Sequence, residues 1–208
     1  MLAQAVVYIV DDDAAACEAV AALVGEMGVV AKTYPSAEAF LHDYDGHRPG
    51  CLVTDVRMLG MSGVELQEKL ARDGISLSVV VLTAYADTRT TIRAIQGGAV
   101  TLLEKPCRDQ ELWDAIQAAL RQDVEKYSSE QRLDDIRRRI AALTPAEKKV
   151  LELIVQGVSN KVMAKRLGVS VRTIEVRRHK VFEKLQADSL AELVRMYLEA
   201  FPQDAARD

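Results

Sequence analysis

The first half of the chain alternates short apolar runs with segments of helical periodicity. The apolar runs predict strands over residues 6–10, 29–34, 51–54, 78–82 and 100–104. The segments between and after them predict helices over residues 14–27, 36–44, 63–73, 87–96 and 109–122. Apolar strands that alternate with helices are typical of a parallel sheet covered on both faces. The pattern therefore predicts an α/β fold with a doubly wound, five-stranded parallel sheet.

Residues 123–143 contain neither Gly nor Pro and are predicted to extend the preceding helix. Apolar residues here and just before follow an approximate heptad spacing: Ile116, Leu120, Tyr127, Leu133, Ile136, Ile140 and Leu143. A helix this long needs packing partners, because propensity alone does not keep it folded in water. Two interpretations stay open. The apolar face packs on domains of the same chain, or it forms a short parallel coiled coil with a second chain.

From residue 144 onward the pattern is entirely helical, which predicts an all-α domain. The segment TPAE at 144–147 combines a cap, a first-turn proline and an acidic residue, which together indicate a helix start. A helix-turn-helix is predicted next. It consists of a short helix over 160–167, a turn that begins at Gly168 and a basic helix over 172–185. The predicted organisation is a first domain, a helical linker and a helix-turn-helix domain at 1–122, 123–143 and 144–208.

The net charge of −4 conceals a difference between the two halves. Residues 1–122 carry 10 Lys and Arg against 17 Asp and Glu, whereas residues 144–208 carry 12 against 9. An acidic module joined to a basic one fits a regulatory domain attached to a polyanion-binding domain. The three cysteines are far apart, and the chain lacks an apolar run of about 18 residues. We therefore expect a cytoplasmic protein with reduced thiols and no membrane partner.

Chemically reactive side chains follow the predicted strands. They are Asp11, Asp12 and Asp13 after the first strand, Asp55 after the third, Thr83 after the fourth and Lys105 after the fifth. Open parallel sheets bind ligands at the carboxyl ends of their strands, so these groups are expected to meet. Clustered carboxylates repel one another, and Mg²⁺ relieves that repulsion. A carboxylate beside Mg²⁺, an ammonium and a hydroxyl is equipped to accept a phosphoryl group as an acyl phosphate.

The motifs around these side chains resemble the receiver domain of two-component response regulators, which has a flavodoxin-like fold. The matching segments are IVDDD (9–13), LVTDVRM (52–58), MSG (61–63), VVLTAYAD (80–87) and GGAVTLLEKP (97–106). The resemblance implies that Asp55 accepts the phosphoryl group, which Thr83 and Lys105 bind. It also implies a cis peptide bond between Lys105 and Pro106. The implied Mg²⁺ ligands are Asp11 through water, and directly Asp12, Asp55 and the backbone carbonyl of Arg57.

Two positions depart from the receiver pattern. Leu59-Gly60 stands where receivers usually have a proline, which is expected to loosen the loop over the site. Leu102 stands where receivers often carry an aromatic switch residue. The switch is therefore expected to be weaker, or to be carried by Thr83 and its loop, with Tyr85 as a partial substitute.

Residues 143–185 read LTPAEKKVLELIVQGVSNKVMAKRLGVSVRTIEVRRHKVFEKL and resemble a LuxR/NarL-type DNA-binding domain. With the first half included, the resemblance to FixJ-type response regulators covers nearly all 208 residues. It implies base-edge contacts from Glu175, Val176 and His179 of the basic helix. The candidates for phosphate contacts are Arg172, Thr173, Arg177, Arg178, Lys180 and Lys184. Inward spacing is predicted for Ile174, Val181 and Leu185.

These observations predict a transcription regulator controlled by phosphorylation of Asp55, with a histidine kinase as donor. We expect it to bind double-stranded DNA, to form a homodimer when phosphorylated through a face around residues 87–120, and not to be an enzyme. The alternative is a DNA-binding regulator whose receiver is an interaction platform that needs no phosphate. A phosphatase of the haloacid-dehalogenase type also uses Asp-x-Asp after its first strand, but Ala15 stands where that family has Thr.

Overall fold

A computed structural model describes residues 5–85 and 88–202 and divides the chain into two compact units. These are an N-terminal unit, Met1–Ser128, and a C-terminal unit, Ser129–Asp208. The described residues of the N-terminal unit form one five-stranded parallel sheet in the order β2-β1-β3-β4-β5. The strands are β1 (Val6–Val10), β2 (Val30–Tyr34), β3 (Gly50–Asp55), β4 (Ser78–Thr83) and β5 (Thr101–Glu104). Each begins and ends within one residue of the predicted range.

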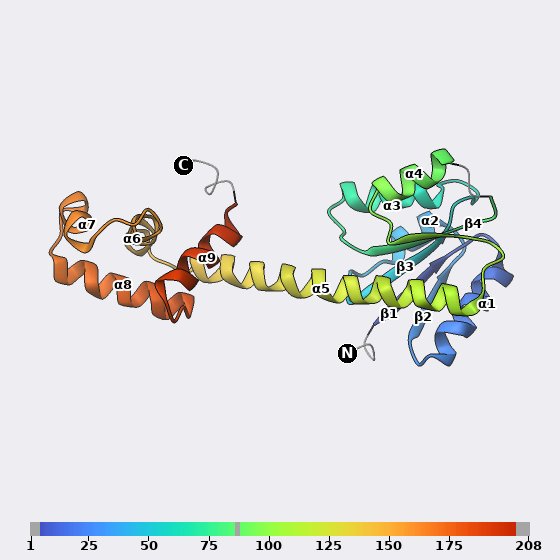
Figure 1. The fold of residues 1–208 in the computed structure, drawn as a ribbon, viewed down its shortest axis with the longest axis horizontal. Coiled ribbons are helices and arrows are strands. Elements are labelled where there is room, and N and C mark those ends of the chain that lie inside the picture. Colours follow the sequence, from blue (N-terminus) through green and yellow to red (C-terminus); the bar gives the residue numbers. More distant parts are fainter. Residues whose placement is uncertain (1–4, 86–87, 203–208) are drawn as a thin grey trace. The chain divides into compact units, whose positions relative to one another are not determined.

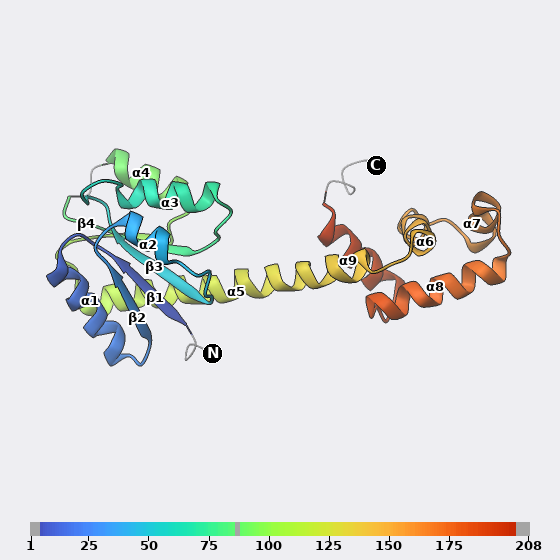
Figure 2. The ribbon, with the colours of Figure 1, turned by 180° about the vertical axis from the view of Figure 1, so that it is seen from behind.

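Helices cover both faces of this sheet, as Figures 1 and 2 show. One face is covered by α1 (Ala14–Glu26) and the first part of α5 (Asp109–Ala141). The other carries α2 (Ala37–Asp43), α3 (Gly63–Arg72) and α4 (Thr88–Gln96). The predicted α/β doubly wound class is confirmed. Asp87, the predicted first residue of the fourth helix, lies outside the described residues.

Short polar side chains determine where α2 and α3 begin. Ser36 caps α2, because its hydroxyl accepts a hydrogen bond from the Ala39 backbone N–H at 3.1 Å. Ser62 and Glu65 form a reciprocal capping box at the start of α3. Each such cap satisfies a backbone donor that the helix leaves free and contributes about 1 kcal/mol.

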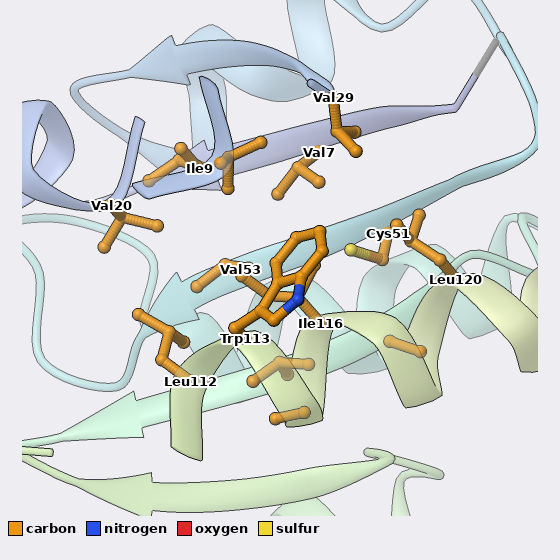
Figure 3. Packing of buried hydrophobic residues seen from close by; sticks show 14 of the residues in the cluster. Val7, Ile9, Val20, Val29, Cys51, Val53, Leu112, Trp113, Ile116 and Leu120 are labelled. Carbon is orange, nitrogen blue, oxygen red and sulfur yellow. The ribbon is translucent and has the colours of Figure 1, made fainter. Parts of the chain in front are cut away.

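The core between the sheet and α5 is built from aliphatic side chains around a single large ring. Figure 3 shows Trp113, Ile116 and Leu120 of α5 lying against Val53 and Cys51 of β3. Ile116 and Leu120 are fully buried. Burial of each such side chain stabilises the fold by about 1.5–3 kcal/mol. The opposite core contains an aromatic cluster of Tyr8, Tyr34, Phe40 and Tyr44.

A buried ion pair ties α5 to the loop before β3. The carboxylate of Asp123 has no exposed surface and accepts hydrogen bonds from Arg48 Nη2 at 3.0 Å, Arg48 Nε at 3.2 Å and Gly50 N at 2.9 Å. One helical turn later, the ring of Tyr127 lies 5.1 Å from the Arg48 guanidinium. Two buried charges are tolerated here because the carboxylate is bonded by several donors and the guanidinium is paired.

The segments predicted as helix over 109–122 and 123–143 form one continuous helix, α5, which ends at Ala141. Within the C-terminal unit, Ile136 and Ile140 are 3% and 7% exposed and belong to that unit's core. Ile116 and Leu120 belong to the core of the N-terminal unit. These side chains are already buried within their own chain, which favours intramolecular packing over the coiled-coil interpretation. None of the helices in the described part of the chain is both long and apolar enough to cross a membrane.

The C-terminal unit consists of the end of α5 and four further helices among its described residues. They are α6 (Pro145–Val155), α7 (Asn160–Leu167), α8 (Val171–Leu185) and α9 (Leu190–Ala200). Gly168 ends α7 in the left-handed region at φ 65°, which suits glycine, and Ser170 caps α8. Ile174, Val181 and Leu185 are buried, as their spacing predicts.

Candidate phosphorylation site and nucleic-acid interface

Three of the predicted site residues meet at the carboxyl edge of the sheet. Lys105 follows β5, and its Nζ lies 2.7 Å from Asp11 Oδ2 and 2.7 Å from Asp55 Oδ1. Asp11 follows β1 and Asp55 ends β3, and the two residues are only 5% and 7% exposed. The parallel register of the strands brings these groups together although 94 residues separate Asp11 from Lys105.

The ammonium of Lys105 is held in its charged form. Burial lowers its pKa, but the hydrogen bonds and charges of Asp11 and Asp55 outweigh burial and raise the pKa above its ordinary value. The Lys105–Pro106 peptide bond is cis, as the resemblance to receivers predicts. This charged group is therefore positioned to neutralise added negative charge on Asp55.

The other acidic residues after β1 have different surroundings. Asp13 caps α1, because its Oδ1 accepts a hydrogen bond from Ala15 N at 2.9 Å. Asp12 is exposed, and its Oδ2 accepts a hydrogen bond from Leu59 N at 2.9 Å. At the end of β3, the second oxygen of Asp55, Oδ2, accepts a hydrogen bond from Arg57 N at 2.6 Å. Across residues 5–85 and 88–202, no three His, Cys, Asp or Glu side chains are grouped as a metal site.

The donor chemistry of this edge nevertheless fits Mg²⁺. Asp11 and Asp12 follow β1 and Asp55 ends the neighbouring strand β3, and two of these three carboxylates, Asp11 and Asp55, share the ammonium of Lys105. The excess of negative charge on hard oxygen atoms suits a small divalent cation. Direct coordination of a metal through Asp12 Oδ2 would require this oxygen to leave the Leu59 amide.

Thr83 is fully buried, and its hydroxyl is bonded to the loop after β4. Its Oγ1 donates to the carbonyl of Tyr85 at 2.9 Å and accepts from Tyr85 N at 3.2 Å. Binding a phosphoryl oxygen on Asp55 would require rotation away from these partners. The ring of Tyr85 is exposed and lies 6.0 Å from the guanidinium of Arg57. Leu102, at the usual position of the switch ring, packs against the core beside α4.

Glu38 supports the loop over the site and was not identified from the sequence. Its Oε1 accepts a hydrogen bond from Met61 N at 3.2 Å. A Cβ atom at Gly60, where φ is 82°, would lie only 3.1 Å from this oxygen. The Leu59-Gly60 sequence signals an unusual loop, but it does not identify a partner on α2.

The exposed surface of α8 carries the predicted DNA contacts. Arg172, Glu175, Val176, His179 and Lys180 are exposed, and Thr173, Arg177 and Arg178 are half-buried. A groove of about 520 Å³ runs between the start of α6 and α8, lined in part by Arg172, Arg177 and Lys180. Its basic lining suits a nucleic-acid phosphate.

Lys184 lies in a different environment from these residues. Its Nζ is 2.7 Å from Oε2 of Glu147, a residue 5% exposed at the start of α6. The same Oε2 accepts from Thr144 N at 2.8 Å. The hydrogen bond from Lys184, followed by that from Thr144, lowers the pKa of Glu147 from 4.5 to about 2. Lys184 therefore links α8 to the α6 cap, a contact that the spacing of residues along α8 does not predict.

Two families account for most of the chain. Residues 7–117 match the response regulator receiver domain, and residues 141–197 match the bacterial regulatory proteins of the luxR family. The chain therefore belongs to the response regulators that combine a receiver domain with a luxR-type DNA-binding domain.

Relatives of the FixJ type extend this similarity to nearly the whole chain. The transcriptional regulatory protein FixJ of Bradyrhizobium diazoefficiens is 38% identical over 194 residues, which cover 93% of this chain and 95% of the relative. FixJ of Azorhizobium caulinodans is 41% identical over 192 residues, covering 92% and 91%. The solved structure of the response regulator StyR has 36% identity and a TM-score of 0.84, covering 93% of this chain and 98% of that one.

Proposed function

We propose that this chain regulates transcription in response to phosphorylation of Asp55 by a partner histidine kinase. The observation that carries the proposal is the shared contact of Asp11 and Asp55 with Lys105 at the carboxyl edge of the sheet. A buried carboxylate beside an ammonium, at the open end of a parallel sheet, can act as a nucleophile toward phosphorus.

In the proposed step an Asp55 oxygen attacks the phosphorus of a phosphohistidine. A P–O bond forms, the P–N bond breaks, and the released imidazole nitrogen takes up a proton. Lys105 can stabilise the transferred phosphoryl oxygens, because its Nζ already lies 2.7 Å from Asp55 Oδ1. Thr83 would rotate from Tyr85 toward the phosphoryl group. The added charge of about −1.5 to −2 then favours a new arrangement of the loop after β4.

The proposed Mg²⁺ ligands are Asp12, Asp55, the backbone carbonyl of Arg57 and, through water, Asp11. When bound, Mg²⁺ would neutralise charge on the phosphoryl oxygens and on the carboxylates. Receivers generally bind Mg²⁺ at this site, and the charge excess around Lys105 supports the same requirement here.

For the C-terminal unit we propose that α8 enters the major groove of double-stranded DNA. Its exposed residues Glu175, Val176 and His179 would contact base edges, where Val176 suits a thymine methyl group. The basic residues along the groove beside α6 would contact phosphates, which position the helix without selecting a sequence. DNA binding implies a cytoplasmic location, and the proposed role is regulation rather than enzymatic turnover.

The proposal includes pairing of two phosphorylated chains through the face formed by α4, β5 and α5. Ile92 and Ile95 of α4 are 49% and 51% exposed, and apolar side chains on a surface helix favour association. The alternative, a platform that works without phosphate, is disfavoured by the paired Asp55 and Lys105.

Footprinting of the full chain on DNA tests the regulatory proposal. Acetyl phosphate with Mg²⁺ is expected to give protection at lower protein concentration, because phosphorylation shifts the chain toward its binding-competent form. Asp55→Asn is expected to give the same footprint with and without acetyl phosphate. Equal protection of DNA by the wild-type chain in both conditions would favour the platform alternative.

The salt dependence of DNA binding separates Lys180 from Lys184. Lys180→Ala is expected to weaken binding to all sequences and to reduce the slope of log K against log salt by about 0.9, one phosphate contact. Lys184→Met is expected to leave this slope unchanged, because the ammonium of Lys184 is already paired with buried Glu147. If Lys184→Met reduced the slope as much as Lys180→Ala, Lys184 would be a phosphate contact, as its basic helix suggests.

A further inference from the structure

We propose that the backbone N–H of Leu59 competes with Mg²⁺ for Oδ2 of Asp12, so that metal coordination through this oxygen releases the loop between β3 and α3 from Asp12. The inference rests on the proposed role of Asp12 as a metal ligand. It adds a positioning residue, Leu59, which acts through its backbone.

The contact itself is a charge-assisted hydrogen bond. Leu59 N lies 2.9 Å from Asp12 Oδ2. Such a bond withdraws electron density from the carboxylate and fixes its orientation, and both effects oppose transfer of that oxygen to a cation. Asp11 and Asp55 are meanwhile drawn together by Lys105. Asp12 thus binds the loop while the other two carboxylates share the ammonium.

The donor exists because residue 59 is not a proline. Proline lacks a backbone N–H, so a chain with the usual receiver residue at this position cannot form the bond. The Leu59 side chain is 83% exposed, so the backbone group makes the interaction. The position therefore allows a clean comparison. Leu59→Ala removes the side chain and keeps the donor, whereas Leu59→Pro removes the donor.

A second attachment keeps this loop in place when Asp12 is released. Glu38 Oε1 accepts from Met61 N at 3.2 Å and lies against Gly60. Metal binding is therefore expected to break the contact between Asp12 and Leu59 N, while the contact between Glu38 and Met61 N still holds the loop. The Mg²⁺ affinity of the site and the conformation of Leu59 become thermodynamically linked.

Titration calorimetry with Mg²⁺ alone, without a phosphodonor, tests the inference on the full chain. Leu59→Pro is expected to lower the Kd for Mg²⁺ about 5- to 10-fold, and Leu59→Ala is expected to match the wild type. Asp12→Asn is expected to weaken Mg²⁺ binding in every background. Equal Kd values for Leu59→Pro and Leu59→Ala, with Asp12→Asn still defective, would overturn the competition and leave the metal site intact. Normal binding by Asp12→Asn would overturn the proposed metal role of Asp12 and the competition with it.

Hydrogen exchange on the wild-type chain gives an independent test that does not depend on the folding of the proline variant. The Leu59 amide is expected to be protected without Mg²⁺ and to exchange faster when Mg²⁺ is added, because its acceptor is lost. The Met61 amide, bonded to Glu38, serves as the internal control and is expected to stay protected. Protection of Leu59 that is unchanged or increased by Mg²⁺ would contradict the inference.

Discussion

Asp55→Asn is expected to abolish phosphorylation by acetyl phosphate and Mg²⁺, whereas the wild-type chain takes up one phosphoryl group. An amide oxygen is a poor nucleophile, and the variant loses the charge that Lys105 stabilises at 2.7 Å. Mass spectrometry of the intact chain measures the uptake directly. The expected effect is complete loss of labelling, because Asp55 is the proposed acceptor, whereas Asp12 and Asp13 are bonded to the backbone amides of Leu59 and Ala15.

Asp45→Asn is the matched control for this experiment. Asp45 is an exposed aspartate of the same unit, and its carboxylate lies 3.7 Å from Lys32 Nζ. The control variant is expected to be labelled like the wild type. Labelling of Asp55→Asn at the wild-type level would show that another residue accepts the phosphoryl group, and the assignment of the site would be wrong.

Asp123→Ala is expected to destabilise the N-terminal unit by about 3–5 kcal/mol, since it removes the carboxylate that balances the buried charge of Arg48. The pair is almost free of solvent, with side-chain exposures of 9% for Arg48 and 0% for Asp123. The change also removes the acceptor of the Gly50 N–H. Hydrogen exchange in a urea series, read separately on peptides of the sheet and of α6–α9, measures the loss and its location.

Glu68→Ala provides the comparison for a solvent-exposed pair. Glu68 Oε1 lies 2.7 Å from Arg93 Nη2, but the two side chains are 42% and 47% exposed. Exposed pairs contribute about 0.2–1 kcal/mol, so this variant is expected to change stability little. The double variant Arg48→Met with Asp123→Leu is expected to be more stable than Asp123→Ala, because it removes both buried charges. If Asp123→Ala cost no more than Glu68→Ala, the buried pair would not anchor α5.

The strands and most helix boundaries could be predicted because local signals determine them. Apolar runs mark β1–β5, and the capping sequence at 144–147 marks the start of α6. The lack of Gly and Pro predicted that α5 is long and continuous. The packing partner of its apolar face could not be predicted, because the same heptad spacing fits both a coiled coil and a domain core. Burial of Ile136 and Ile140 in the C-terminal unit favours the core.

The meeting of Asp11, Asp55 and Lys105 could also be predicted, since all parallel strands end at one edge. Contacts that depend on the direction of a single side chain could not be predicted from the sequence. The Thr83 hydroxyl is directed to Tyr85, and Lys184 is directed to Glu147, which is 37 residues away in the sequence. Neither direction has a local sequence signal. The Thr83 contact depends on the conformation of the loop after β4, and the Lys184 contact depends on packing between α8 and α6.

The position of Trp113 gives each half of this protein a different spectroscopic signature. It is the single tryptophan of the chain, and it lies 8% exposed in the core between the sheet and α5 (Figure 3). Indole emission shifts to longer wavelength when the ring meets water. Fluorescence therefore reports opening of the N-terminal unit and is insensitive to melting of α6–α9, whereas far-ultraviolet circular dichroism reports both. Comparing the two signals during denaturation shows whether the units unfold together or one after the other.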